Sequence, residues 1–400
     1  MSEVQSAGAP LLANKRIAIV GGGPSGLTLA RLLQMNGGDV TVFELDASPT
    51  ARDQGGELDL HEDSGQIAIR RAGLMDEFAK VSRPEAQVSR VYDKHGAIHL
   101  DIGLADEKIT RPEIERRALR NLLVNSLTPN TVQWGRLLRS VERTPQRNFR
   151  LTFSDGTVAE ADLLFGADGT WSKVRPLVTP IKPQYSGVTF IETRLSAPDT
   201  RHPDIARFVG PGTIMVTSDN RAMMAQRNGS DHIRIYVILR VPEDWSRSGG
   251  IDFDNPAQAR AKLFEPFAEW SPQVTAMLRH SDDTFIPRPL YNVPVDQSWS
   301  SQPDVALLGD AAHVMPPFTG KGANYAMLDA VELAENLTSG RYADVATAIR
   351  AYDVKMLKRM WDSVAETMES QEVMISPQAP RGILELFQQR IRRALAARSQ

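Results

Sequence analysis

The chain has 400 residues, with 46 lysines and arginines against 49 aspartates and glutamates, and its formal charge is −3. This near balance gives no electrostatic support to nucleic-acid binding. Hydrophobic residues make up 42% of the chain, which is enough for two domains with a large core and argues against extensive disorder. The sequence has no cysteine, which excludes disulfides, iron–sulfur clusters, thiolate zinc sites and a cysteine nucleophile.

The first 14 residues predict a loose leader. They contain Glu3 and only a short apolar stretch at Pro10–Leu12, whereas a secretory signal needs a basic start and about 7–15 apolar residues. No window of the sequence approaches the roughly 20 uninterrupted apolar residues of a membrane span. We therefore expect a cytoplasmic, monomeric protein that binds no membrane and no nucleic acid.

The first 45 residues predict a β-α-β unit. Arg16–Val20 is a β-branched apolar run that ends at Gly21, and leucines then repeat at helical spacing through Ser25–Met35. Asp39–Glu44 reads as a second strand, so the helix crosses between parallel strands. The fold class at the N-terminus is therefore α/β.

The remaining chain predicts two architectures. Strands are expected at 132–135, 137–144, 149–153, 161–166 and 305–308, and helices at 113–127, 322–337, 345–374 and 381–397. Residues 187–241 alternate instead as strands of an antiparallel sheet. The predicted boundaries are a leader at 1–14, a discontinuous cofactor domain at 15–180 and 285–340, a substrate domain at 181–284, and C-terminal helices at 341–400.

The segment GGGPSG carries the first chemical signal. Gly21, Gly23 and Gly26 form G-x-G-x-x-G, and Pro24 and Ser25 open the helix that follows. This pattern lets the backbone approach a pyrophosphate and directs a helix N-terminus at its charge, although a structural glycine turn is the alternative.

An acidic residue supports the dinucleotide interpretation. Glu44 ends the next strand, where a carboxylate would bind ribose hydroxyls and would repel a 2′-phosphate. FAD or NAD therefore fits this turn better than NADP does.

Two later acidic turns favour FAD over NAD. Asp168 follows a strand in DLLFGADGTWSKVR, and Gly309-Asp310 follows another in VALLGDAAHVMPPFTGKGAN. With these three segments in order, residues 15–375 resemble the single-component FAD-dependent aromatic hydroxylases. The resemblance implies a Rossmann-like FAD-binding domain, an inserted antiparallel β-sheet substrate domain and a C-terminal bridging helix.

A narrower resemblance is to the tetracycline-inactivating monooxygenases of that family. It rests on GGELDLHEDSGQ (55–66), PEIERRALRNLLVNSL (112–127) and GDAAHVMPPFTGKGAN (309–324). It implies that Arg52 serves NADPH. It also implies that further residues bind FAD, namely Asp59, Arg116, Asp310, Pro317, Gly320, Gly322, Ala323 and Asn324.

The same resemblance implies a set of substrate residues. Thr213 and Arg234 stand where those enzymes have an arginine and a histidine, and Glu192 replaces a glutamine. The expected substrate set is Glu192, Thr213, Met224, Arg234, Phe318 and Met374. Arg234 would favour an enolate or carboxylate if its side chain points to the substrate, and strand alternation leaves that open.

The implied reaction is hydroxylation of a polycyclic or phenolic compound by NAD(P)H and O2 through a flavin C4a-hydroperoxide. A tetracycline-like antibiotic is the leading substrate, and NADPH would bind transiently. The alternatives are a flavin oxidoreductase, a hydroxylase of a simple aromatic compound, and a flavoprotein that only sequesters a ligand. A metal site is not expected, since the seven histidines show no metal-ligand spacing. No catalytic side chain is expected either, and we expect His313 to have a packing or hydrogen-bonding role.

Overall fold

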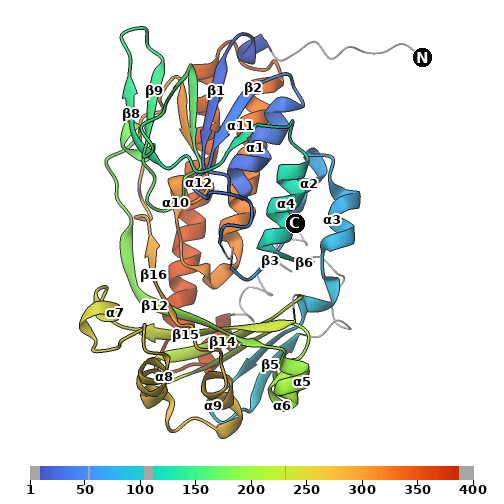
Figure 1. Cartoon of the computed structure of the whole chain (residues 1–400), viewed down its shortest axis with the longest axis vertical. Helices are drawn as coiled ribbons and strands as arrows, with labels where there is room; N and C mark the ends of the chain where they lie inside the picture. Colours follow the sequence, from blue (N-terminus) through green and yellow to red (C-terminus); the bar gives the residue numbers. More distant parts are fainter. Residues whose placement is uncertain (1–9, 53–54, 103–110, 230, 387–400) are drawn as a thin grey trace. The chain divides into compact units, whose positions relative to one another are not determined.

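The computed structural model describes residues 10–52, 55–102, 111–229 and 231–386 (Figure 1). The chain divides into two compact units, and each is built from separate segments. The first unit comprises Met1–Ser82, Arg116–Gln184 and Tyr291–Ala365, and the second comprises Arg83–Glu115, Tyr185–Leu290 and Glu366–Gln400.

The first unit is built on a parallel five-stranded sheet in the order β17-β11-β1-β2-β7. Its strands are β1 (Arg16–Val20), β2 (Asp39–Phe43), β7 (Val132–Gln133), β11 (Leu163–Gly166) and β17 (Val305–Leu307). Every residue of β11 and β17 is buried, as expected for parallel strands covered on both faces. Three more strands form an antiparallel sheet, namely β8 (Leu138–Arg143), β9 (Phe149–Phe153) and β10 (Val158–Ala161), and a short strand, β3 (Glu57–Asp59), precedes α2.

The first unit has seven helices among its described residues. They are α1 (Pro24–Gln34), α2 (Gly65–Arg71), α3 (Met75–Val81), α4 (Arg116–Asn125), α10 (Asp310–His313), α11 (Lys321–Thr338) and α12 (Val345–Met374), with 3-10 turns at Pro10–Leu12, Arg175–Leu177 and Pro317–Thr319. Helix α1 has Pro24 at its first turn, buries Leu27, Leu29 and Leu33, and packs against α11 and directly on the parallel sheet. The division between the units falls within α12, after Ala365.

The second unit is built on a seven-stranded sheet in the order β16-β12-β15-β14-β13-β4-β5. Its strands are β4 (Ser89–Tyr92), β5 (Ile98–Ile102), β12 (Gln184–Ser196), β13 (Thr213–Ser218), β14 (Arg221–Asn228), β15 (His232–Arg240) and β16 (Ile286–Asn292), while β6 (Glu113–Glu115) lies outside this sheet. The pairs β12–β15, β15–β14, β14–β13 and β4–β5 are antiparallel, whereas β13 and β4 are parallel.

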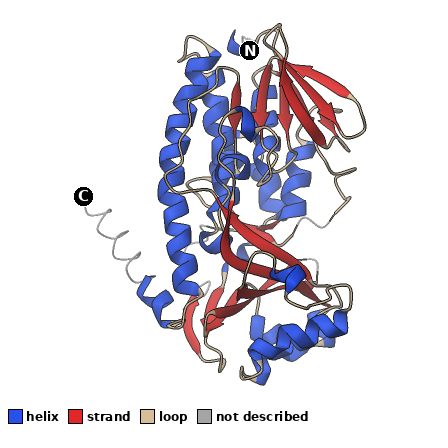
Figure 2. Ribbon diagram, turned by 90° about the vertical axis from the view of Figure 1, so that its left-hand side faces the viewer, coloured by secondary structure: helices blue, strands red, loops and turns tan. Residues whose placement is uncertain are grey.

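One face of this sheet is buried by helices (Figure 2). The helices of the unit are α5 (Pro198–Arg201), α6 (Pro203–Val209), α7 (Trp245–Ser248), α8 (Pro256–Phe264) and α9 (Pro272–Arg279), with 3-10 turns at Pro84–Gln87 and Glu265–Phe267. Ile233, Ile235 and Val237 of β15 form a core with residues of α6, α8 and α9, such as Phe208 and Met277. We call this the helix-covered face, and we call the other side the opposite face.

The α/β fold class with a separate antiparallel sheet is confirmed, but three local predictions need correction. Glu113–Glu115, predicted as the start of a helix, forms β6, and the helix begins at Arg116. Residues 83–115 supply β4 and β5 to the second unit, which the alternation in 187–241 could not reveal. Leu12, within the predicted leader, is 2% exposed, while residues 1–9 lie outside the described residues. The predicted last helix is helical over 381–386, and its remainder lies outside the described part. Among the helices that the structure describes, none is long and apolar enough to span a membrane.

Asp353 of α12 is a buried acid in the first unit. It is 1% exposed, and neither oxygen of its carboxylate has a hydrogen-bond partner within the described residues. Burial raises the pKa of Asp353 to about 6, and the nearby polar groups of Ser301 and Trp299 oppose that rise only in part. The folded protein therefore favours the protonated acid more than the unfolded chain does.

Asp353→Asn should stabilise the protein increasingly as the pH rises. The native acid contributes stability that is fully present below about pH 4, its unfolded pKa, and is lost as the pH rises through about 6. The neutral variant should exceed the native protein in unfolding free energy by about 1–3 kcal/mol at pH 8, and by less at pH 5. Urea unfolding at both pH values measures this difference, with Asp362→Asn at an exposed site of the same helix as the control. A pH-independent difference would contradict the prediction.

Candidate functional site

The three predicted cofactor segments meet at one edge of the parallel sheet. Strands β1, β11 and β17 are neighbours and run in the same direction, so their carboxyl ends lie together. Gly21 follows β1, Asp168 lies two residues beyond β11, and Gly309 lies two residues beyond β17. Open α/β sheets bind ligands at this edge.

The glycine turn after β1 is packed against the turn after β11. Gly21 has φ +104°, and a Cβ built on it would lie 2.2 Å from the carbonyl oxygen of Ala167. A Cβ on Gly26 would lie 2.0 Å from the carbonyl oxygen of Gly21. These two glycines are required by the fold itself.

Gly23 differs from the other two glycines of the motif. Its backbone is extended, and a Cβ at this position would meet no atom within 4 Å. It directly precedes α1, where Pro24 is partly exposed and Ser25 is buried. The chain therefore leaves a space at a helix N-terminus, which fits a phosphate group.

Glu44 lies directly after β2 and is 3% exposed. One of its carboxylate oxygens accepts a 2.5 Å hydrogen bond from the amide of Gly22, and the other accepts a 2.9 Å bond from the amide of Asp46. The Arg120 guanidinium lies 3.4 Å from it. Glu44 thus holds the glycine turn, and its role toward ribose stays a prediction.

Arg52 also lies near this loop. Its Nε donates to Asp46 at 2.7 Å, and Arg120 donates to the other oxygen of Asp46 at the same distance. Although burial acts to raise it, the pKa of Asp46 is lowered because Arg120 and Arg52 stabilise the charged form. The Arg52 side chain is 58% exposed, so the loop presents it to solvent.

Asp168 is held in the turn after β11. One carboxylate oxygen accepts a 2.7 Å bond from the amide of Lys173, while the other is buried without a partner in the described residues. Burial raises the pKa of Asp168, and hydrogen bonds from Ser172 and the backbone oppose this rise. A buried acceptor without a donor fits a ligand hydroxyl.

Arg175 joins the two acidic turns and is 4% exposed. It donates 2.8 Å hydrogen bonds to the carbonyl oxygens of Thr170, Asp310 and Ala311. No role for Arg175 was predicted, although it lies in the same segment, 162–175, as Asp168. Its partners Asp310 and Ala311 lie far from it in the sequence, so no local pattern indicated these hydrogen bonds.

Asp310 begins α10, and its side chain is accessible to solvent. The carboxylate makes no hydrogen bond with another described residue. The protein packed around it nevertheless raises its pKa, and the charges of His313, Arg116 and Arg175 oppose that rise. An open acid at a helix start within a densely packed surround is suited to accept ligand hydroxyls.

Asp329 of α11 fixes the turn that carries Asp310. It is fully buried and accepts hydrogen bonds from the Gly309 amide at 2.9 Å, from His313 at 2.6 Å and from Arg359 at 2.6 Å. Burial acts to lower the pKa of His313, but Asp329 raises it overall. His313 thus has the hydrogen-bonding role that the sequence favoured.

Asn324, near the start of α11, ties this helix to the segment after β3. Its side-chain oxygen accepts from the amides of His61 at 2.8 Å and Gly65 at 3.2 Å, and its nitrogen donates to the carbonyl oxygen of Asp59. A Cβ on Gly320 would lie 3.0 Å from the Asp59 carboxylate. Asn324 therefore brings two predicted cofactor segments together.

The other predicted cofactor residues lie in the same unit. Arg116 is exposed at the start of α4, and Gly55 lies beside its side chain. Pro317 is exposed, and Gly322 and Ala323 are partly exposed at the start of α11, where a Cβ on Gly322 would meet nothing within 4 Å. Phe318 is 7% exposed in the adjoining turn.

The remaining substrate candidates lie in the second unit, on the opposite face of its sheet. Thr213 pairs with Gln226, which pairs with Arg234, and Met224 pairs with Tyr236, which pairs with Glu192. Directly paired residues point to the same side, so these side chains share one face. Met374 comes to the same face, because its carbonyl oxygen accepts a 2.5 Å bond from Thr217.

Arg234 does not present an open charge on this face. It is 3% exposed and forms an ion pair with Glu192, which also pairs with Arg288 of β16. The charge of Arg234 is already compensated by Glu192, and its assignment to the substrate stays a prediction. Arg288 is a residue that the sequence analysis missed.

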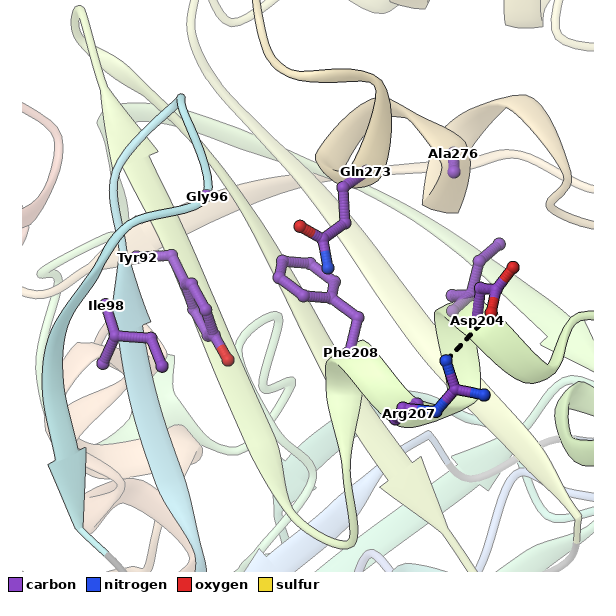
Figure 3. A pocket seen from close by; sticks show the side chains of 9 residues that line it. Tyr92, Gly96, Ile98, Asp204, Arg207, Phe208, Gln273 and Ala276 are labelled. Atoms are coloured by element: carbon purple, nitrogen blue, oxygen red, sulfur yellow. Dashed lines mark hydrogen bonds and ion pairs between the residues drawn. The ribbon is translucent and has the colours of Figure 1, made fainter.

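A separate groove of about 470 Å³ lies in the second unit between the β4–β5 hairpin and helices α6 and α9 (Figure 3). Tyr92, Phe208 and Gln273 line it, and Asp204 pairs with Arg207 at 3.0 Å beside it. It contains no predicted site residue. Across the described ranges, no group of three or more histidine, aspartate or glutamate side chains is arranged to hold a metal ion.

Comparison with known proteins assigns the chain to a protein family. The profile of the family described as FAD binding domain matches residues 14–367. Monooxygenase asqM of Emericella nidulans is 32% identical over 377 residues, covering 80% of this chain and 83% of that protein.

Solved structures share the fold. HpxO of Klebsiella pneumoniae, solved with FAD and uric acid, has a TM-score of 0.76 at 22% identity, covering 93% of this chain and 92% of that one. The tetracycline destructase Tet(51) has a TM-score of 0.69 at 19% identity, covering 93% and 94%. The chain therefore belongs to the FAD binding domain family, and its relatives include monooxygenases.

Proposed function

We propose that this protein is an FAD-dependent monooxygenase that uses NAD(P)H and O2 to hydroxylate an aromatic or polycyclic substrate. The observation that carries the proposal is the meeting of three turns at one sheet edge, with a space at Gly23 and acids at Asp168 and Asp310. The family membership supports FAD as the ligand of that edge.

The residues fit FAD in their chemistry. The start of α1 offers backbone amides and a favourable dipole to a pyrophosphate. The carboxylates of Glu44, Asp59, Asp168 and Asp310 are acceptors for cofactor hydroxyls, and Arg116 is a cationic donor. Amides at the start of α11, from Gly322 to Asn324, would stabilise negative charge on the ring system.

FAD, when bound, supplies the redox chemistry with NAD(P)H and O2. The chain's own residues would bind the cofactor, orient the substrate and exclude water from the site. Asp329 and Arg175 hold the turn of Asp310 from two sides, so that this acid is preorganised before a ligand arrives. Arg52, exposed beside Asp46, is the residue we assign to NADPH.

For the substrate, a tetracycline-like fused-ring compound is the leading candidate. The resemblance of segments 55–66, 112–127 and 309–324 to the tetracycline-inactivating monooxygenases supports it, and the fold shared with Tet(51) is compatible with it. Met224, Phe318 and Met374 are the apolar residues that we assign to ring contacts, with Glu192, Thr213 and Arg234 as polar ones. These polar residues differ from those of the tetracycline-inactivating enzymes, so a related ring system with other substituents is the expected preference.

Two glycine variants separate cofactor binding from folding. Gly23→Ala should leave the unfolding midpoint of the cofactor-free protein unchanged, because its Cβ meets no described atom, and should weaken FAD binding by roughly ten- to hundredfold. Gly21→Ala is the matched variant. It should destabilise the cofactor-free protein by about 1–3 kcal/mol, because an alanine here would have a strained positive φ and its Cβ would clash with Ala167. FAD titration and thermal unfolding measure both. Unchanged FAD affinity in Gly23→Ala would place the cofactor elsewhere.

Arg52→Ala should slow reduction by NADPH and leave FAD bound. Loss of one charge-assisted hydrogen bond of about 1.5–3 kcal/mol corresponds to roughly a ten- to hundredfold weaker interaction with NADPH. Stopped-flow absorbance measures the reduction rate, and the flavin spectrum measures FAD content. Arg71→Ala, which removes a similarly exposed ion pair with Glu335, is the control. A variant that loses FAD and keeps its reduction rate would reverse the assignment.

The reaction itself is tested on the purified protein. We expect a yellow protein with noncovalent FAD that couples NADPH oxidation and O2 uptake to a mass gain of one oxygen atom on a tetracycline. Simple phenolic acids are the comparison substrates, and turnover of these alone indicates an ordinary aromatic hydroxylase. NADPH oxidation without oxygen transfer indicates a flavin oxidoreductase, and tetracycline binding without NADPH oxidation indicates sequestration. A preparation that neither contains nor takes up FAD overturns the proposal.

A further inference from the structure

A charge cluster of three side chains lies on the opposite face of the second unit's sheet. Glu192 of β12 uses one carboxylate oxygen for Arg234 of β15 and the other for Arg288 of β16. One carboxylate thus serves two guanidinium groups, so the cluster carries one positive charge in excess.

The excess charge belongs to Arg288 rather than to Arg234. Glu192 and Arg234 are 5% and 3% exposed, whereas the Arg288 side chain is 48% exposed. Arg288 bonds Glu192 through Nε, and its two terminal nitrogens have no partner among the residues that the structure describes. Those nitrogens form the planar fork that binds carboxylates and similar anions in a bidentate manner.

A row of side chains extends from this cluster across the sheet. The register pairs Glu192 with Tyr236, Tyr236 with Met224, and Met224 with Met215. Directly paired residues lie on one face, and neighbouring strands are about 4.8 Å apart, so the row from β12 to β13 spans about 14 Å. That length suits a ligand of two or three fused rings.

The chemistry of the row suits a flat ring system. Tyr236 packs against Phe190 in a tilted arrangement with a centroid separation of 5.6 Å, and Tyr236, Met224 and Met215 are all partly exposed. Aromatic and thioether side chains form adaptable apolar contacts with aromatic ligands. The row is therefore cationic at the β16 edge and apolar toward β13.

We propose that Arg288 is the specificity-determining residue for an aromatic substrate that carries one anionic group, a carboxylate or an enolate, with its rings along Tyr236, Met224 and Met215. This inference rests on the proposed function. Glu192 is a positioning residue, because it neutralises Arg234 and orients the Arg288 fork. The orientation of the substrate along the row follows from the charge at only one end.

The test compares matched anionic and neutral ligands on the FAD-loaded protein. The probes are 1-hydroxy-2-naphthoate and its amide, and salicylate and its amide, with binding measured by titration calorimetry. We expect the native protein to prefer each carboxylate. Arg288→Gln should weaken carboxylate binding by roughly ten- to hundredfold and leave amide binding within about twofold. The carboxylate affinity of Arg288→Lys should lie between that of the native protein and that of Arg288→Gln, since lysine keeps the charge but lacks the planar fork.

Arg194→Gln is the control variant. Arg194 pairs directly with Arg234 in the sheet, forms an ion pair with Asp282 and has a side chain 53% exposed, so its loss removes a similar charge from the same face. We expect Arg194→Gln to leave the binding of both the carboxylates and the amides unchanged.

Two results would overturn the inference. One is a native protein with no preference for a carboxylate over its amide, and the other is an Arg288→Gln variant that loses both ligands equally or neither. Either result leaves the monooxygenase proposal standing if FAD binds and oxygen transfer occurs. Conversely, an FAD-loaded protein that prefers the carboxylates through Arg288 but transfers no oxygen would contradict the monooxygenase proposal and leave this inference standing.

Discussion

The fold of the first unit depends on one buried guanidinium. Parallel strands bring their carboxyl ends together, and the turns beyond them have carbonyl groups that need hydrogen-bond donors and two acidic side chains, Asp168 and Asp310, that need a compensating charge. Arg175 meets both needs, because it donates to three carbonyl oxygens across two turns and places a positive charge near Asp168 and Asp310. Breaking such a buried network leaves unpaired polar groups, which costs about 1–3 kcal/mol for each.

Asp329 holds the same turn from its other side. It accepts hydrogen bonds from the Gly309 amide, from His313 and from Arg359, and therefore fixes Gly309 in a conformation with φ +57°. The two networks leave the Asp310 carboxylate as the group that is open to a ligand. The binding edge is thus preorganised by residues that themselves need not contact the cofactor.

The sequence predicted what short-range patterns encode. The G-x-G-x-x-G turn, the strands around it and the limits of α12 follow from local spacing and hydrophobic periodicity, and they agree with the structure. The sequence did not reveal Arg175, whose partner Asp310 lies 135 residues away, or the pairing of Arg120 with Asp46 over 74 residues. It also could not decide the side of β15 on which Arg234 lies, because alternation gives two faces, and only the packing of Ile233 and Ile235 into the helix-covered core distinguishes them. The predicted roles of the site residues remain predictions.

The discontinuous second unit has a consequence for protein engineering. Strand β4 comes from residues 83–115, yet it pairs in parallel with β13, where Ser89 is opposite Thr213. A chimaera made with a single crossover between residues 115 and 185 would combine β4 from one parent with β13 from the other. Exchange of substrate preference between homologues therefore requires that both segments be transplanted together, with at least the β4–β13 junction inherited from one parent.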